Sequence, residues 1–139
     1  MKTALALLSV VMLQASSDYT SAAQSIPGLD GMMVRIAEIE IDPESLDEYL
    51  AILKEESAAS VRLEPGVISI YPMYEKDNPT SIRIVEIYAS KAAYESHLQT
   101  PRFQHYKTST LRMVKSLRLV DMAPIDAASM PKIFAKLGK

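Results

Sequence analysis

The stretch EPGVISIYPMYEKDNPTSIRIVEIYASKAAYESHLQTPRFQHYK, residues Glu64–Lys107, decides the fold of this chain. It opens with Glu-Pro-Gly, which is turn chemistry, and two runs rich in β-branched and aromatic residues follow, Val67–Glu75 and Thr80–Ala89. The short connection between them, Lys76–Pro79, predicts an antiparallel hairpin. Pro72 has no N–H to donate to a ladder, so the first strand is expected to have a bulge or an edge there.

Two helices are expected after the hairpin. Ser90 can cap a helix that begins at Lys91, because its side-chain oxygen accepts a hydrogen bond from a free N–H at the helix start. Thr100-Pro101 repeats the cap, and a proline at the first helical position gives up a donor that had no partner. The sequence therefore predicts a second helix that extends to about Lys115.

The flanking residues complete a βαββαβ order. A strand is expected at Met32–Ile41, a helix start at Asp42-Pro43 and a fourth strand at Ser116–Met122. The buried face of the first helix recurs at helical spacing through Leu46, Tyr49, Leu50, Leu53 and Ser57. With its second helix broken in two, this order is typical of a ferredoxin-like α+β fold, in which an antiparallel sheet has helices on one face. The tail, Ala123–Lys139, is expected to form a short final helix or an arm.

Both faces of the predicted sheet are apolar. In the strand at Thr80–Ala89, Ile82 and Ile84 point to one face, while Val85 and Ile87 point to the other. The preceding strand divides in the same way, into Ile68 and Ile70 against Val67 and Met73. Because the helices cover one face only, the other would be an association site if left bare. We therefore predict a homodimer whose two sheets face each other.

Composition excludes several classes of function. The chain has no cysteine, which removes disulfides, iron–sulfur clusters and thiolate chemistry. Its formal net charge of −2 gives no electrostatic reason to expect a nucleic acid or a membrane surface as partner. The expected partner is a small molecule or another copy of the chain.

The N-terminal residues have the pattern of a secretory signal. Lys2 is followed by an apolar segment, Thr3–Leu13, that is shorter than the roughly 20 residues a bilayer requires. Small residues at Ser21-Ala22-Ala23 favour cleavage after Ala23 over cleavage after Ala15, and a periplasmic or secreted bacterial protein is expected; an uncleaved anchor or a buried helix is the alternative. The predicted division is a signal at 1–23, a flexible lead-in at 24–31, a domain at 32–122 and an extension at 123–139.

Titratable side chains gather within Val85–Tyr106, against apolar neighbours. A strand with a carboxylate (Glu86) and a phenol (Tyr88) leads into a helix with an imidazole (His97), so chemistry is expected here if anywhere. The second histidine, His105, has polar neighbours and is expected at the surface. Two histidines at i and i+8 across a helix break lack metal-ligand spacing, and no metal site is predicted.

The stretch from Glu64 to Lys107 resembles the antibiotic biosynthesis monooxygenase (ABM) domain of the dimeric α+β barrel superfamily. The shared features are E-P-G, a strand with a late Tyr, a D-x-P loop, a strand with V-E-x-Y/W and the run H-L/F-x-T/S-P-x-F. The resemblance implies two ferredoxin-like copies that form one barrel. It also implies a quinol monooxygenase-like enzyme that oxidises small phenols or quinols without a cofactor, in a cavity between sheet and helices.

The resemblance also suggests a role for each candidate residue. An electron-rich phenol that has lost its proton can give an electron to O₂, so the protein needs a base, an apolar pocket and donors for the anion. His97 is the expected base, because an imidazole titrates near neutral pH, and Glu86 can orient it or accept a proton. Tyr74 or Tyr88 can hold a substrate oxygen, and Arg35 can stabilise the developing anion.

Each residue also has a structural alternative. His97 can be a hydrogen-bonded core or interface residue, and the two tyrosines can pack with only their hydroxyl groups at the rim. A carboxylate that shares a face with isoleucines should be paired, so Glu86 can form a salt bridge with Arg35, Arg83 or a partner-chain residue.

Two further classes of function stay open. One is a binding module that sequesters a small aromatic molecule, and the other is an isomerase or decarboxylase-like enzyme that moves protons without O₂. Haem cleavage is not expected, because the haem-degrading branch of the superfamily places Trp at the position of His97 and an iron ligand at that of Lys107, and this chain has no Trp.

Overall fold

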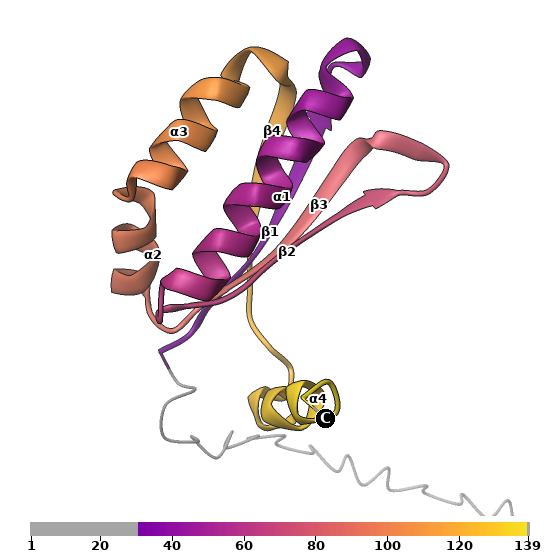
Figure 1. Ribbon diagram of the computed structural model, residues 1–139. Coiled ribbons are helices and arrows are strands. Elements are labelled where there is room, and N and C mark those ends of the chain that lie inside the picture. The colour runs from indigo at the N-terminus through magenta and orange to yellow at the C-terminus, as the bar shows by residue number, and fades with distance from the viewer. Residues whose placement is uncertain (1–30, 139) are drawn as a thin grey trace, which may run out of the picture.

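Four strands pair into one antiparallel sheet in the order β2-β3-β1-β4, as the computed structural model shows for residues 31–138 (Figure 1). The strands are β1 (Met33–Ile41), β2 (Val67–Glu75), β3 (Asn78–Tyr88) and β4 (Val114–Met122). This order confirms the ferredoxin-like α+β fold. The expected signal segment and its cleavage after Ala23 lie outside the described residues.

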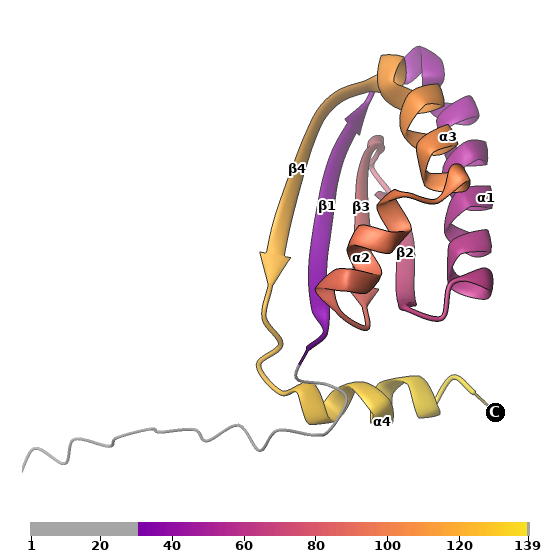
Figure 2. The same ribbon diagram turned by 90° about the vertical axis from the view of Figure 1, so that its left-hand side faces the viewer.

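Three helices cover one face of this sheet (Figure 2). They are α1 (Leu46–Leu63), α2 (Lys91–Leu98) and α3 (Pro101–Thr110). All three predicted helix starts are confirmed, because the side chain of each capping residue accepts a hydrogen bond from a backbone N–H. Asp42 accepts from Glu44 at 3.0 Å, Ser90 from Ala93 at 3.0 Å, and Thr100 from Phe103 at 3.2 Å. The Asp42 cap precedes a short 3₁₀ turn, Pro43–Ser45, that leads into α1.

The predicted end of α3 at Lys115 is wrong. The helix ends at Thr110, and a 3₁₀ turn, Leu111–Met113, leads directly into β4. Met113 is fully buried, and its carbonyl oxygen accepts a hydrogen bond from the N–H of Asp42 at 2.8 Å. This hydrogen bond holds Met113 next to Asp42, the residue that precedes the first helical turn, so α3 must end before Met113.

Strand β2 differs from its predicted alternation. A register shift between Val67 and Ser69 inserts an extra residue, so Val67 and Ile70 both face the helices and are buried. Grouping Ile68 with Ile70 was therefore wrong. Pro72 lies on an edge strand, as its missing N–H requires, and pairs with Ile84.

The core lies between the sheet and α1. It joins Ala37, Ile39, Ile41, Ile82 and Ile84 of the sheet to Tyr49 and Leu53 of α1. On the opposite face of the sheet, the register aligns Val34 with Ile87 and Ile36 with both Val85 and Val120. Tyr71, opposite Val85, is 63% exposed on this same face. The sheet thus has an apolar surface that no helix of residues 31–138 covers.

Beyond β4, the chain turns at Ala127–Ser129 and forms α4 (Met130–Ala135), which agrees with the predicted short final helix. Figures 1 and 2 place α4 past the end of the sheet, away from the other three helices. Among the described helices, none combines the length and apolar character needed to cross a membrane.

Candidate active site

Four of the five predicted site residues surround one cavity between the sheet and the helices. The cavity has a volume of about 100 Å³, and Arg35, Glu86, Tyr88 and His97 all line it. Its other walls are mainly aliphatic and aromatic side chains. The strand and helix segments that the sequence singled out therefore do converge on one cavity.

The fifth predicted residue, Tyr74, lies elsewhere. Its side chain is 54% exposed and lines a separate groove between α1 and the β2–β3 hairpin. It faces the helix side of the sheet, opposite Ile82, but the hairpin bends away from α1 toward its tip (Figure 1). The structure therefore does not bring Tyr74 to the His97 cavity.

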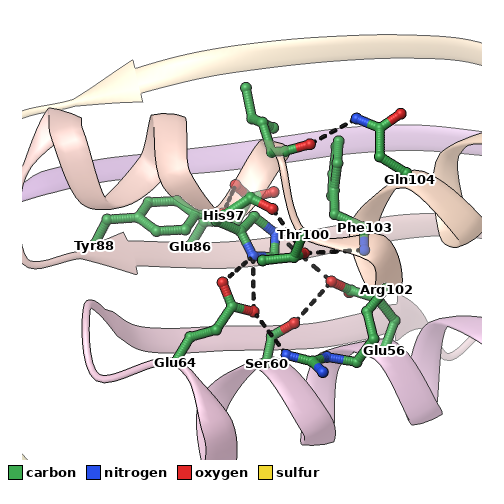
Figure 3. A network of polar contacts seen from close by, with 11 residues as sticks. Glu56, Ser60, Glu64, Glu86, Tyr88, His97, Thr100, Arg102, Phe103 and Gln104 are labelled. Atoms are coloured by element: carbon green, nitrogen blue, oxygen red, sulfur yellow. Dashed lines mark hydrogen bonds and ion pairs between the residues drawn. The ribbon is translucent and has the colours of Figure 1, made fainter.

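His97 is buried between two carboxyl groups from α1 and the turn after it (Figure 3). Its Nδ1 lies 3.1 Å from Oε1 and 3.2 Å from Oε2 of Glu64, and its Nε2 lies 3.6 Å from Oε1 of Glu56. The ring also packs between Tyr88 and Phe103, with centroid distances of 5.6 and 5.0 Å. Within residues 31–138, Glu64 rather than Glu86 makes the contact that orients this imidazole.

The turn Glu64-Pro65-Gly66 holds α2 close enough for this contact. A Cβ atom built at Gly66 would lie 2.6 Å from the Cβ of Ala93, so only glycine permits the observed approach of α2. The carbonyl oxygen of Gly66 also accepts a hydrogen bond from the N–H of Ala89 at 2.8 Å. The sequence turn thereby places Glu64 beside His97, one helical turn beyond Ala93.

Glu56 is a buried carboxyl on the inner face of α1. Only 7% of the residue is exposed, and the Ser60 hydroxyl donates a hydrogen bond to its Oε1 at 2.9 Å. Burial raises the pKa of Glu56, and the Ser60 hydrogen bond and the nearby His97 oppose this shift. The second carboxyl beside His97, that of Glu64, has a cationic neighbour as well: its Oε2 lies 3.6 Å from the guanidinium of Arg102.

Glu86 lines the cavity from β3. The Tyr88 hydroxyl donates a hydrogen bond to its Oε2 at 2.9 Å. Burial raises the pKa of the Glu86 carboxyl, while the Tyr88 hydrogen bond and the charges of Arg35 and His97 lower it. Burial beside this carboxyl also raises the pKa of Tyr88. Glu86 is therefore a group that holds its proton more strongly than an exposed glutamate does.

The salt bridge suggested as an alternative role for Glu86 does not form within the described chain. Arg35 instead donates to Asp121 and to the Tyr94 hydroxyl, both at 2.8 Å, and its guanidinium lies 4.7 Å from the centre of the Tyr94 ring. Arg83 lies 3.2 Å from Glu75. Asp121 and Tyr94 thus hold Arg35, the predicted cation, at one side of the cavity.

Replacing Glu86 by glutamine is expected to raise the free energy of unfolding at neutral pH but not in acid. Because burial raises the folded pKa above the unfolded value of 4.5, the wild type loses stability as the pH rises through this window, whereas glutamine has no charge to bury. Urea unfolding at several pH values measures the difference. It should grow from about pH 4 and then level off above the folded pKa. Glu55→Gln, which makes the same substitution at an exposed position on α1, is the matched control.

Sequence reasoning missed Glu56, Glu64 and Tyr94. Glu56 follows Leu46, Tyr49 and Leu53 at helical spacing, on the buried face of α1. Because glutamate is rarely buried without a partner, its place on this face could have marked it as a candidate site residue. Glu64 was interpreted only as turn chemistry. His105 is exposed on α3, as predicted, with its Nδ1 3.3 Å from the Ser109 hydroxyl. Between residues 31 and 138, no three His, Cys, Asp or Glu side chains are grouped to hold a metal ion.

Together these features define a ferredoxin-like α+β protein with a cluster of titratable side chains around a cavity between its sheet and its helices. Residues 32–109, more than half of the chain, match the family described as antibiotic biosynthesis monooxygenase. The chain belongs to that family, which confirms the resemblance seen in the stretch from Glu64 to Lys107.

Relatives from three bacteria support the assignment. A solved structure from Bacteroides thetaiotaomicron, provisionally named an antibiotic biosynthesis monooxygenase, is 52% identical with a TM-score of 0.70, over 70% of this chain and 93% of that one. A provisionally named monooxygenase from Lactobacillus acidophilus is 28% identical with a TM-score of 0.66, over 68% of this chain and 45% of that one. An uncharacterised Synechocystis protein is 32% identical over 87 residues, 62% of this chain. The chain spans only 58% of that relative's length.

Proposed function

We propose that this protein is a monooxygenase that oxidises a small phenol or quinol with O₂ and without a metal or a flavin. One observation carries the proposal: a buried imidazole oriented by the Glu64 carboxyl shares one cavity with the half-buried carboxyl of Glu86. Buried acid and base groups that face a cavity are typical of sites that move protons.

The reaction balances without an external reductant. A hydroquinone and O₂ give a hydroxyquinone and water, so one oxygen atom enters the ring and the other leaves as water. The base first takes a phenolic proton, and the phenolate then gives an electron to O₂. The resulting radicals combine into a peroxide, which loses water to form the carbonyl. All four electrons come from the substrate, and the protein supplies proton transfer and charge stabilisation.

The geometry suggests how the residues divide this work. Glu64 accepts a hydrogen bond from the Nδ1–H of His97, which leaves the lone pair on Nε2 to act as the base, beside the Glu56 carboxyl 3.6 Å away. Glu86, whose pKa is raised by burial, can return a proton to the departing oxygen. Arg35 adds positive charge to the cavity wall, where it favours the phenolate. Tyr88 holds Glu86 in place through its hydroxyl group.

The cavity limits the size of the substrate. Its volume of about 100 Å³ is smaller than the roughly 150 Å³ of an engineered protein cavity that binds benzene. A single aromatic ring is therefore the largest body that small side-chain movements would accommodate. We accordingly favour single-ring quinols and catechols over fused polycyclic substrates.

Oxygen uptake by chelator-treated protein tests the reaction. We expect consumption of O₂ with single-ring hydroquinones, and one labelled oxygen atom in the product when ¹⁸O₂ is used. Product formation without O₂ would instead indicate an isomerase or decarboxylase-like enzyme. Saturable binding with no turnover across the panel would indicate a binding module, and either result would overturn the proposal.

We also propose that the protein is a homodimer, with the apolar sheet faces of two copies packed together. The support is the surface formed by Val34, Ile36, Tyr71, Val85 and Val120, which no described helix covers. A sheet face of this kind is covered in stable proteins by another layer, and a second copy of the same surface is self-complementary.

A further inference from the structure

A second, larger hollow lies between α1 and the β2–β3 hairpin. It is a groove of about 580 Å³, within the range of pockets that hold small organic ligands. Leu53 and Ile70 line both this groove and the His97 cavity, so they form the wall between them. The groove is therefore next to the proposed active site but separate from it.

A buried hydroxyl group without a partner lines this groove. Ser57 is only 4% exposed, and its Oγ has no hydrogen-bond partner among the described residues. A buried polar group in this state costs free energy, and native proteins rarely leave one unsatisfied. An acceptor atom on a ligand in the groove would satisfy it.

The charged side chains of the groove are both cationic. Lys54 and Arg62 line it, and no aspartate or glutamate does. Neither cation forms an ion pair with another side chain of residues 31–138. The remaining lining is mainly aliphatic, with Val61 and Met73 43% and 40% exposed. The groove thus combines an apolar floor with a positive rim.

Lys54 and Ser57 lie one helical turn apart on α1, as neighbours on one face. Because α1 runs toward the turn that begins β2, Lys54 lies nearer the hairpin tip and Tyr74, while Arg62 lies nearer the start of β2 (Figure 1). An ammonium group and a hydroxyl donor on the helix wall of a largely apolar groove match a carboxylate head with an apolar body.

We propose that this groove is a binding site for an amphipathic carboxylate, such as a medium-chain fatty acid. Lys54 and the Ser57 hydroxyl hold the carboxylate, and the chain lies against Val61, Ile70 and Pro72. The site goes beyond the proposed oxidation and does not depend on it, because no residue that acts on the phenol takes part.

Calorimetric titration of the full-length protein with decanoate, below its micelle concentration, tests the site. We expect saturable binding of decanoate at least about tenfold tighter than that of decyltrimethylammonium, which has the same chain and the opposite charge. Lys54→Gln should weaken decanoate binding by about tenfold, because it removes a charge-assisted contact. Added salt should weaken binding to the wild type more than to this variant.

A matched pair of tryptophan substitutions locates the ligand. Ala58 is exposed and lines the groove, whereas Ala51 is exposed on α1 but does not line it. Ala58→Trp should abolish decanoate binding, and Ala51→Trp should leave it unchanged, with equal thermal stability for both variants. Absence of decanoate binding, or equal binding by both variants, would overturn the proposal. A third outcome would also overturn it: the wild type does not bind decanoate, and Ala58→Trp changes the oligomeric state. The groove would then hold a segment of a second copy of the chain.

Discussion

Replacement of His97 by alanine is expected to lower kcat/KM for the quinol substrate by about 10²–10⁴-fold, the usual contribution of a positioned general base. Glu64 holds Nδ1 of the imidazole at 3.1 Å. Among the described side chains that line the cavity, His97 is the only imidazole, so no other group there can replace it as the base. Initial rates of O₂ consumption, measured over a range of substrate concentrations, give the change.

Two variants separate this chemical role from a structural one. His105→Ala removes the exposed histidine of α3 and should retain the activity of the wild type. Glu64→Gln retains the size of the side chain but weakens its hold on Nδ1, so kcat should fall while KM changes little. If His97→Ala keeps more than about a third of wild-type kcat/KM while remaining folded, the assignment of His97 as the base is wrong.

Replacement of Ile36 by glutamate is expected to convert the proposed dimer into a monomer. Ile36 pairs with Val85 on one side and Val120 on the other, at the centre of the uncovered sheet face. An isologous interface would bury the new charge twice, and each buried unpaired charge costs several kcal/mol. The dissociation constant should therefore rise by at least about 10³-fold. Light scattering at micromolar concentration measures the mass.

The matched control is Ala51→Glu, which introduces the same charge on the exposed side of α1. It should leave the mass unchanged. A wild-type protein that is already monomeric at micromolar concentration would contradict the dimer.

Local chemistry explains how much of the fold was predictable. The Asp42, Ser90 and Thr100 caps depend on neighbours two or three residues away, and all three form as predicted. The helices α2 and α3 begin directly after their caps, whereas α1 follows the 3₁₀ turn that Asp42 caps. The errors arise where distant parts of the chain decide. The end of α3 depends on a contact between Met113 and Asp42, and the facing of β2 on a bulge that its alternation does not reveal.

The same distinction applies to the candidate site. Glu86, Tyr88 and His97 lie within twelve residues, so a strand followed by a helix was enough to bring them together. The partner of His97 lies 33 positions earlier, and only the packing of α2 on the turn reveals it. Tyr74 was predicted at the cavity through the family resemblance, as one of two tyrosines that can hold a substrate oxygen. The course of the hairpin relative to α1, which keeps Tyr74 away from the cavity, is a property of the assembled fold.

The contact between Gly66 and Ala93 has a consequence for how mutations at this turn should be interpreted. Gly66 makes no contact with the cavity, yet a methyl group there would push α2 outward and move His97 off Glu64. A screen for inactive variants is therefore expected to find substitutions of Gly66 as well as those of His97 and Glu86, although Gly66 does not line the cavity. Conversely, a compensating change at position 93, from alanine to glycine, could restore what the first change removed. The turn Glu64-Pro65-Gly66 therefore sets how closely α2 approaches α1, and with it the distance between His97 and Glu64.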